Sequence, residues 1–264
     1  MVVALGIVVA LFLGAPIALL VGRAFVGGSL AVALGSGAVA DDLVLSLATT
    51  AVSLAITVLI ATPLAHLLAR RRFRGASIVE ALVDLPIVLP PSVAGLALLL
   101  ALGRRGVIGE PLSALGVSIP FTTIAVVVAQ VFVASPFFIR AARAGFTTID
   151  REVEDAARVD GASERELAWS ITIPLAAPAL AAGIVMTWAR ALGEFGATIM
   201  FAGNVAGRTQ TLPLVVYGEF QSGDVDASVA AAAILILAAF AVLVAVRGLR
   251  WGRALDTRGA NPAA

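Results

Sequence analysis

The chain has 264 residues, of which 60% are hydrophobic and only 13% charged, with a net charge of +1 and no cysteine. Soluble domains carry about 25% charged residues, so this composition, with its long uncharged runs, predicts a membrane protein. Disulfides and thiolate metal sites are excluded, the lone His66 cannot form a metal cluster, and the small net charge indicates no nucleic-acid partner.

The basic residues narrow the chemistry further, because all 18 of them are arginine. A phosphate-binding P-loop needs lysine after its glycines, so any ATP that this protein uses must bind to another chain. His66 ends an apolar run, where a packed or interfacial histidine is expected, and neither a Ser/His/Asp nor a Cys/His set is available. The sequence therefore predicts no catalytic residue and no metal site.

A membrane-spanning helix needs about 20 largely apolar residues, and six segments meet this requirement. They are Val2–Gly22, Leu43–Leu68, Ser77–Gly103, a segment within Pro111–Ile139, Ile171–Gly203 and Ala227–Val246. The first could instead be a signal peptide, since "AVA" at 38–40 resembles a cleavage site, although a basic n-region is missing. Several spans contain prolines, which suits a transporter with interrupted helices and equally suits ordinary kinked packing: Pro63, Pro86, Pro90, Pro91 and Pro136.

Arginine placement predicts the orientation of the six spans. Thirteen arginines fall after span two, between spans four and five, and in the tail: Arg70, Arg71, Arg72, Arg74, Arg140, Arg143, Arg151, Arg158, Arg165, Arg247, Arg250, Arg253 and Arg258. Only four fall on the other side: Arg23, Arg104, Arg105 and Arg208. We therefore expect a multi-pass protein of the cytoplasmic membrane with both termini in the cytoplasm.

The longest cytoplasmic segment, residues 150–174, predicts two short helices around a turn. Asp150 is a good N-cap, and acidic residues crowd the first turn, where the helix dipole favours them. Val153, Ala156 and Ala157 share one face. Gly161 can end the first helix in the left-handed conformation, and Ser163 with Glu166 forms a capping box for the second.

This segment resembles the "EAA" motif of ABC importer permeases. Asp155, Ala156, Ala157, Gly161, Ile171, Ile173 and Pro174 have the spacing of that motif, with Asp155 in place of Glu and Ile173 in place of Leu. The resemblance implies a coupling helix that docks in a groove of an ATPase subunit. The residues implied in this coupling are Glu154, Asp155, Ala156, Ala157, Gly161 and Pro174. The alternative is a solvated amphipathic hairpin that has no partner.

The stretch "ARALGEFGATIMFAGN", residues 189–204, places two charges in an apolar span. Arg190 and Glu194 are four residues apart and are expected to pair, and Thr198 would extend the same helix face. Gly193 and Gly196 would let another helix approach closely. We hypothesise that Arg190, Glu194 and Thr198 line a permeation path or gate; the alternatives are a lock between helices and direct contact with cargo.

Residues from about 43 to 250 resemble permeases for molybdate and tungstate, through "ARALGEFGATIMFAGN", "RTQTLPL" (208–214) and "LPIVLPP…LLLALGRRGVIGE" (85–110). The first span lies outside this resemblance. Sulfate permeases share the "GEFGA" core and are the nearest rival. The resemblance implies an all-α type I ABC importer permease, expected here as a single transmembrane domain over residues 1–264.

The resemblance also implies partners: a second permease copy, two ATPase subunits that bind ATP and Mg²⁺, and an extracytoplasmic oxyanion-binding protein. The permease itself would bind no cofactor and would not be an enzyme. Two readings from other classes are a passive anion channel, which would not need the 150–174 segment, and a membrane-embedded enzyme. Glu80 and Asp84 are the only acid pair for an enzyme, and they more plausibly complement a helix N-terminus or nearby arginines.

Overall fold

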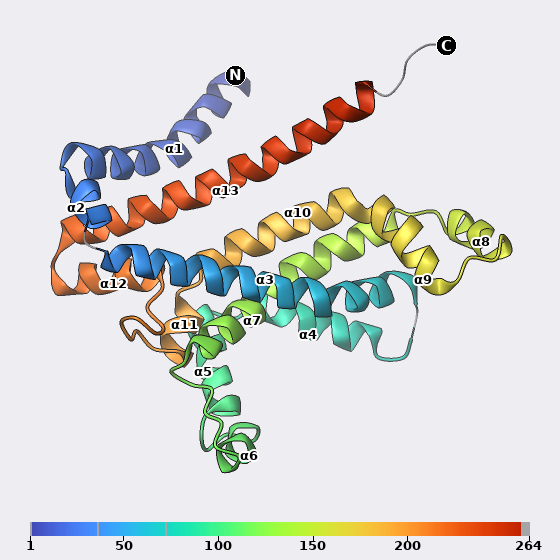
Figure 1. Ribbon diagram of the computed structural model, residues 1–264, viewed down its shortest axis with the longest axis horizontal. Coiled ribbons are helices and arrows are strands. Elements are labelled where there is room, and N and C mark those ends of the chain that lie inside the picture. Colours follow the sequence, from blue (N-terminus) through green and yellow to red (C-terminus); the bar gives the residue numbers. More distant parts are fainter. Residues whose placement is uncertain (1, 36, 72, 260–264) are drawn as a thin grey trace. The chain divides into compact units, whose positions relative to one another are not determined.

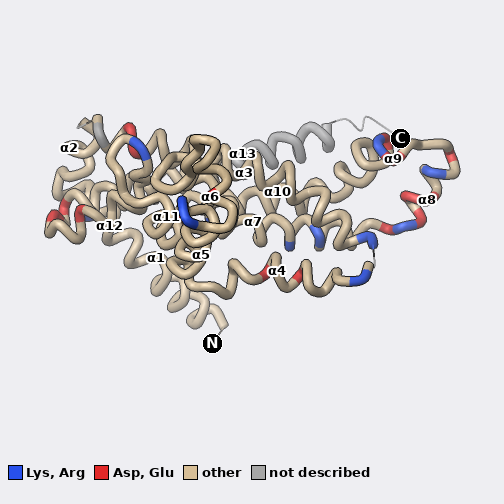
Figure 2. Tube along the Cα trace, turned by 90° about the horizontal axis from the view of Figure 1, so that it is seen from below, with Lys and Arg blue, Asp and Glu red and all other residues tan. Residues whose placement is uncertain are grey.

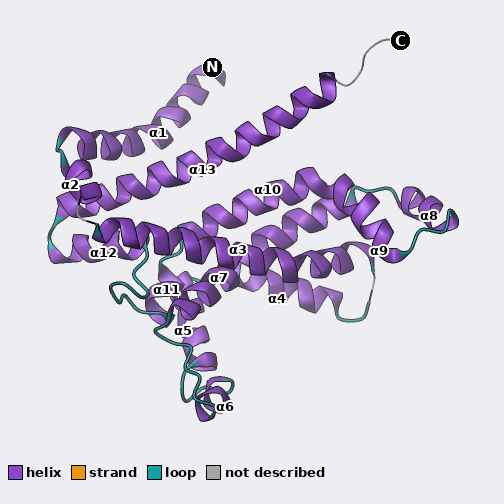
Figure 3. Cartoon of the chain, in the orientation of Figure 1, coloured by secondary structure: helices purple, strands orange, loops and turns teal. Residues whose placement is uncertain are grey.

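The computed structural model describes residues 2–35, 37–71 and 73–259, and within these ranges every regular element is a helix (Figure 3). Arg72, one of the arginines that predicted the orientation, lies outside the described residues. The chain divides into two compact units, residues 1–46 with 210–264 and residues 47–209. The expected single domain over 1–264 stays a prediction.

The first unit consists of α1 (Val2–Val26), α2 (Ser29–Gly35), the start of α3 (Ala38–Arg70), α12 (Leu212–Ser222) and α13 (Val225–Gly259). Its small core joins Ala24, Leu30, Leu212, Ala233 and Ile234. Ala24 is the one buried side chain among the described residues of α1. A 25-residue apolar helix that is exposed along almost its whole length is suited to a lipid environment.

The second unit contains the rest of α3, then α4 (Ala76–Val88), α5 (Pro91–Leu102), α6 (Gly109–Ala114), α7 (Thr123–Thr147), α8 (Arg151–Val159), α9 (Glu164–Leu167), a π-helical turn η1 (Ala168–Thr172), α10 (Ile173–Leu192) and α11 (Gly196–Phe201). In Figure 1, α3, α7 and α10 run alongside one another, and they share a core that includes Leu68, Phe138, Phe146 and Ala176. These helices position both regions that the sequence marked as functional.

Small residues bring the helices of this second unit into close contact. Gly145 of α7 lies directly against Ala179 of α10, and a Cβ on Gly95 of α5 would lie 2.6 Å from the carbonyl oxygen of Ala197. A Cβ on Gly196 would lie 2.7 Å from the Cβ of Pro91, which confirms the close approach expected at Gly196. No such approach occurs at Gly193, where an added Cβ would meet only the preceding turn. Close backbone contact of this kind is the usual basis of helix association in membranes.

Five helices in the described residues are long and apolar enough to cross a membrane: Val2–Val26, Val39–Arg70, Thr123–Thr147, Glu164–Leu192 and Val225–Ala245. They correspond to the expected first, second, fourth, fifth and sixth spans. The expected third span is a pair of helices, α4 and α5, bent by 118°. Counted as one crossing, the pair brings the total in the described chain to six.

The bend in the third span follows from two adjacent prolines. Leu89 and Pro90 both have extended backbones, with ψ of 135° and 132°, and each precedes a proline, which disfavours the helical region for the residue before it. Pro90 and Pro91 therefore break the span as predicted. Pro86 does not, because it lies inside α4, and Pro63 and Pro136 are likewise accommodated within α3 and α7.

Candidate functional site

The segment 150–174 forms the expected helical hairpin. The Asp150 carboxylate accepts a hydrogen bond of 3.0 Å from the Glu152 amide and so caps α8. Gly161 has φ of +92°, the left-handed conformation predicted for it. Ser163 and Glu166 form the predicted capping box at the start of α9. Local sequence chemistry therefore determines where both helices begin and where the turn lies.

A buried ion pair fixes this hairpin to α3. The Glu154 carboxylate lies 2.8 Å from the Arg70 guanidinium and accepts a second hydrogen bond of 3.0 Å from the Thr172 hydroxyl in η1. The two charged side chains are only 10% and 6% exposed. Arg70 also donates to the carbonyl of Ile149, and Arg151 donates to the carbonyl of Arg70. Glu154, which the resemblance implied in coupling to the ATPase, therefore faces the protein and anchors α8.

The exposed side chain of Arg158 links the two helices of the hairpin. Its guanidinium lies 2.8 Å from Asp155 in α8 and 2.8 Å from Glu164 in α9. Hydrogen bonding to Glu164, reinforced by Asp155, raises the pKa of Arg158, which stays charged at any physiological pH. A single side chain thus links the two helices across the Gly161 turn.

Away from the buried Glu154, α8 presents apolar side chains to solvent. Val153 is 46% exposed, Val159 is 87% exposed, and Ala156 between them is also exposed. Ala157, which the sequence placed on the same face, is half-buried. A short helix that is held rigidly on one side and leaves valines exposed on the other has the form of a docking surface.

The second predicted region lies where α10 ends. Arg190 and Glu194 form the expected pair, 2.6 Å apart, with the Glu194 side chain only 1% exposed. The Glu194 carboxylate also accepts a hydrogen bond of 2.7 Å from the Ala197 amide, so it starts the new helix α11. The expectation of one helix running to Gly203, with Thr198 on the face of Arg190, is wrong. Helix α10 ends at Leu192, and the buried Thr198 belongs to the next helix, α11.

A polar contact that the sequence did not single out lies next to this break. Gln130 of α7 is 2% exposed, and its amide nitrogen donates to the hydroxyl of Thr50 and to the carbonyl of Ala191, at 3.3 and 3.2 Å. It thereby connects α3, α7 and the last turn of α10. The available signal was a lone amide in an otherwise charge-free span, where a polar side chain needs a partner.

The remaining polar residues that the sequence singled out have structural partners. Glu80 pairs with Arg143 and Asp84 with Arg140, each at 2.7 Å, which confirms that nearby arginines complement these acids. His66 packs edge-on against the ring of Phe146, as expected for a packed histidine. Figure 2 shows charged residues gathered around α4, α8 and α9 and an uncharged middle of α7 and α10.

Comparisons with known proteins agree with this arrangement. The family described as "Binding-protein-dependent transport system inner membrane component" matches residues 61–250. The chain is 43% identical over 201 residues to the molybdenum transport system permease protein ModB of Mycobacterium bovis, covering 76% of this chain and 75% of that protein. It is 34% identical over 192 residues to the sulfate transport system permease protein CysT of Escherichia coli, covering 72% and 69%.

Solved structures extend the likeness to the fold. A bacterial ABC transporter involved in the import of the acidic polysaccharide alginate superposes with a TM-score of 0.69 at 17% identity, covering 84% of this chain and 82% of that chain. The helical architecture is therefore that of type I ABC importer permeases, as the resemblance implied. The family match covers well over half of the sequence, and the chain belongs to the family of binding-protein-dependent transport system inner membrane components.

Proposed function

We propose that this chain is the membrane permease subunit of an ATP-driven importer and that molybdate or tungstate is its cargo. The observation that carries the importer assignment is the anchored hairpin, with Val153, Ala156 and Val159 exposed on a helix that Arg70 and Arg158 hold in place. A passive channel has no use for such a surface. The greater identity to the molybdenum permease, 43% against 34% for the sulfate permease, supports the choice of cargo.

The proposal includes the partners of the working transporter. Two copies of this chain enclose the path, and two ATPase subunits bind ATP and Mg²⁺ and dock against α8 through Asp155, Ala156, Ala157 and the neighbouring valines. Gly161 shapes the turn, and Pro174 starts the following span. An extracytoplasmic binding protein delivers the oxyanion, and both termini lie in the cytoplasm, as the arginine distribution favours. The permease moves cargo between outward-open and inward-open forms and breaks no bond.

The cargo assignment is tested by ATP-driven uptake in proteoliposomes that contain the permease, its ATPase and its binding protein. Labelled molybdate, tungstate and sulfate are compared at equal concentration. We expect uptake of molybdate and tungstate that persists in excess sulfate. Sulfate uptake at an equal or higher rate would transfer the assignment to a sulfate importer, and anion flux without ATP would contradict the importer class.

The docking surface is tested by Val159→Glu, which places a charge on the exposed apolar face of α8. We expect the affinity for the ATPase to fall about tenfold or more, because the carboxylate would be buried without a partner at the interface. The measurement is binding of purified permease to immobilised ATPase. Val107→Glu is the matched control, since Val107 is 89% exposed and lies far from the hairpin along the chain. Equal losses in both variants would show that α8 is not the docking element.

The break after α10 is tested by Arg190→Ala, alone and combined with Glu194→Gln. The single variant leaves a buried carboxylate unpaired, so we expect molybdate uptake to fall about tenfold while ATPase binding is unchanged. The double variant removes the unpaired charge, and recovered uptake is the result expected if the pair locks the gate. Persistently low uptake would assign Arg190 to direct contact with cargo, and normal uptake in Arg190→Ala would remove it from the mechanism.

A further inference from the structure

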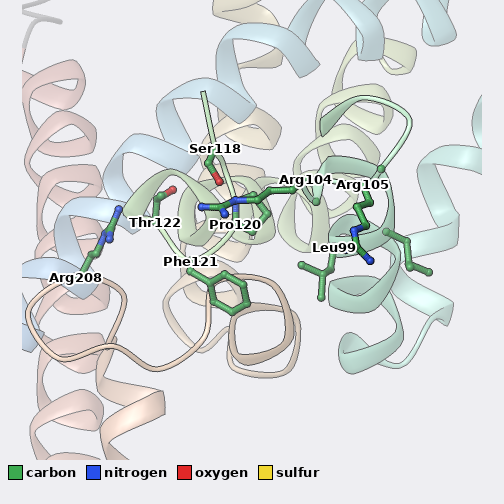
Figure 4. A pocket seen from close by; sticks show the side chains of 11 residues that line it. Leu99, Arg104, Arg105, Ser118, Pro120, Phe121, Thr122 and Arg208 are labelled. Carbon is green, nitrogen blue, oxygen red and sulfur yellow. The ribbon is translucent and has the colours of Figure 1, made fainter. Parts of the chain in front are cut away.

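A basic cavity of about 710 Å³ lies in the second unit, at the end of α5 and the start of α7 (Figure 4). Its wall includes Arg104, Arg105, Ser118, Phe121 and Arg208. In the close-up, Arg104 extends toward Ser118 and Pro120, Arg105 stands beside Leu99, and Arg208 approaches from the far side of Thr122. Two separate loops, one with Arg104 and Arg105 and one with Arg208, therefore bring three arginines to one concave surface.

The charges of this cavity are uncompensated. No aspartate or glutamate lines it, and none of its three arginines forms an ion pair with another described residue. Five arginines of the second unit do have carboxylate partners, namely Arg70, Arg140, Arg143, Arg158 and Arg190, whereas the described Arg71, Arg74, Arg151 and Arg165 form no ion pair and do not line this cavity. Within the described chain no hydrogen bond occupies the Ser118 hydroxyl, which leaves it available as a further donor. Unpaired guanidinium groups between apolar walls attract anions strongly.

The walls of the cavity are held in place. Phe121 has φ of +61°, an uncommon conformation for a residue other than glycine, and its amide donates to the carbonyl of Phe201 at the end of α11. The Thr123 hydroxyl donates to the carbonyl of Arg208 at 2.8 Å. Thr209, next to Arg208, is fully buried and bonds the backbone of Gly203 and Val205. Strained residues that the surroundings hold in place concentrate at binding sites.

The cavity lies close to the residues that are hypothesised to line the permeation path. It lies at the N-terminal end of α7, and the 25 residues of this helix extend roughly 37 Å to the end that leads into α8. That length exceeds the hydrocarbon core of a bilayer, about 30 Å, so the cavity and the hairpin lie on opposite sides of the membrane. The Glu194 carboxylate caps the start of the short helix α11, and the carbonyl of Phe201, the last residue of α11, accepts the hydrogen bond from Phe121 in the cavity wall. The cavity thus adjoins the outer end of the break.

We infer that this cavity is an outer anion site that receives a tetrahedral oxyanion dianion before it enters the path. The inference rests on the proposed function for the identity of the cargo. Guanidinium groups and the Ser118 hydroxyl supply the donors that replace the water around the anion. The volume leaves room for an anion that keeps part of its hydration shell, which suits brief binding at an entrance. Two of the three arginines are adjacent in sequence, and Arg208 closes the site from another loop.

The test uses tungstate as the probe and the complete permease–ATPase complex in lipid nanodiscs, without the binding protein. Isothermal titration at low salt should detect tungstate binding that weakens as salt is added. Arg104→Gln and Arg208→Gln should each weaken binding about tenfold, and the triple variant Arg104→Gln/Arg105→Gln/Arg208→Gln should abolish it. Arg74→Gln is the matched control, because Arg74 is an exposed arginine on the hairpin side, and it should bind as the wild type does.

Wild-type complex that binds no tungstate up to millimolar concentration would overturn the inference, and so would a triple variant that binds normally. A triple variant that keeps tungstate but loses affinity for the binding protein would also overturn it, since the cavity would then be a docking surface. Uptake by the wild-type complex separates the two proposals. If the wild-type complex imports molybdate or tungstate and the triple variant binds tungstate as the wild type does, the anion site alone is rejected. If the arginines bind tungstate but the wild-type complex imports neither molybdate nor tungstate, the cargo assignment alone is rejected.

Discussion

The buried ion pair between Arg70 and Glu154 is the interaction on which the hairpin end of the second unit depends. Both side chains are almost removed from solvent, and the Thr172 hydroxyl and the Ile149 carbonyl complete their hydrogen bonds. Loss of either partner would leave a buried charge without compensation, at a cost of about 3–5 kcal/mol. Because the pair joins α3, α8 and η1, a displacement of α8 must move the ends of two membrane helices with it.

A long helical run connects the hairpin to the Arg190–Glu194 pair. Residues Glu164–Leu192 form one long helical run of α9, η1 and α10. This run ends at Leu192, between Arg190 and Glu194, which form an ion pair. Gly145 and Ala179 hold α7 and α10 in direct contact, and Gln130 fastens the far end through the carbonyl of Ala191. The proposed gate thus lies at one end of this helical run, and α8, which carries the proposed coupling surface, is bonded to its other end through Glu154 and Thr172.

Predictions from the sequence were correct where neighbouring residues determine the structure. The caps at Asp150 and Ser163, the turn at Gly161 and the pair four residues apart at Arg190 and Glu194 are all local, and all are confirmed. The partner of Glu154 is 84 positions away, so nothing local distinguishes this buried acid from its exposed neighbours. The break after Leu192 was missed because Glu194 was assigned one role, as a partner of Arg190, and it also caps α11. The basic cavity was missed because its arginines come from two loops that are far apart in the sequence.

The central claim, that Glu154 anchors the hairpin and so couples it to the spans, is tested most directly by the number of molybdate ions imported per ATP hydrolysed. Glu154→Gln is compared in proteoliposomes with Glu152→Gln, which changes an exposed acid of the same helix. The account predicts that Glu154→Gln lowers this ratio about tenfold while ATP hydrolysis continues, and that Glu152→Gln stays within about twofold of the wild type. A Glu154→Gln complex with the ratio of the wild type would contradict the account.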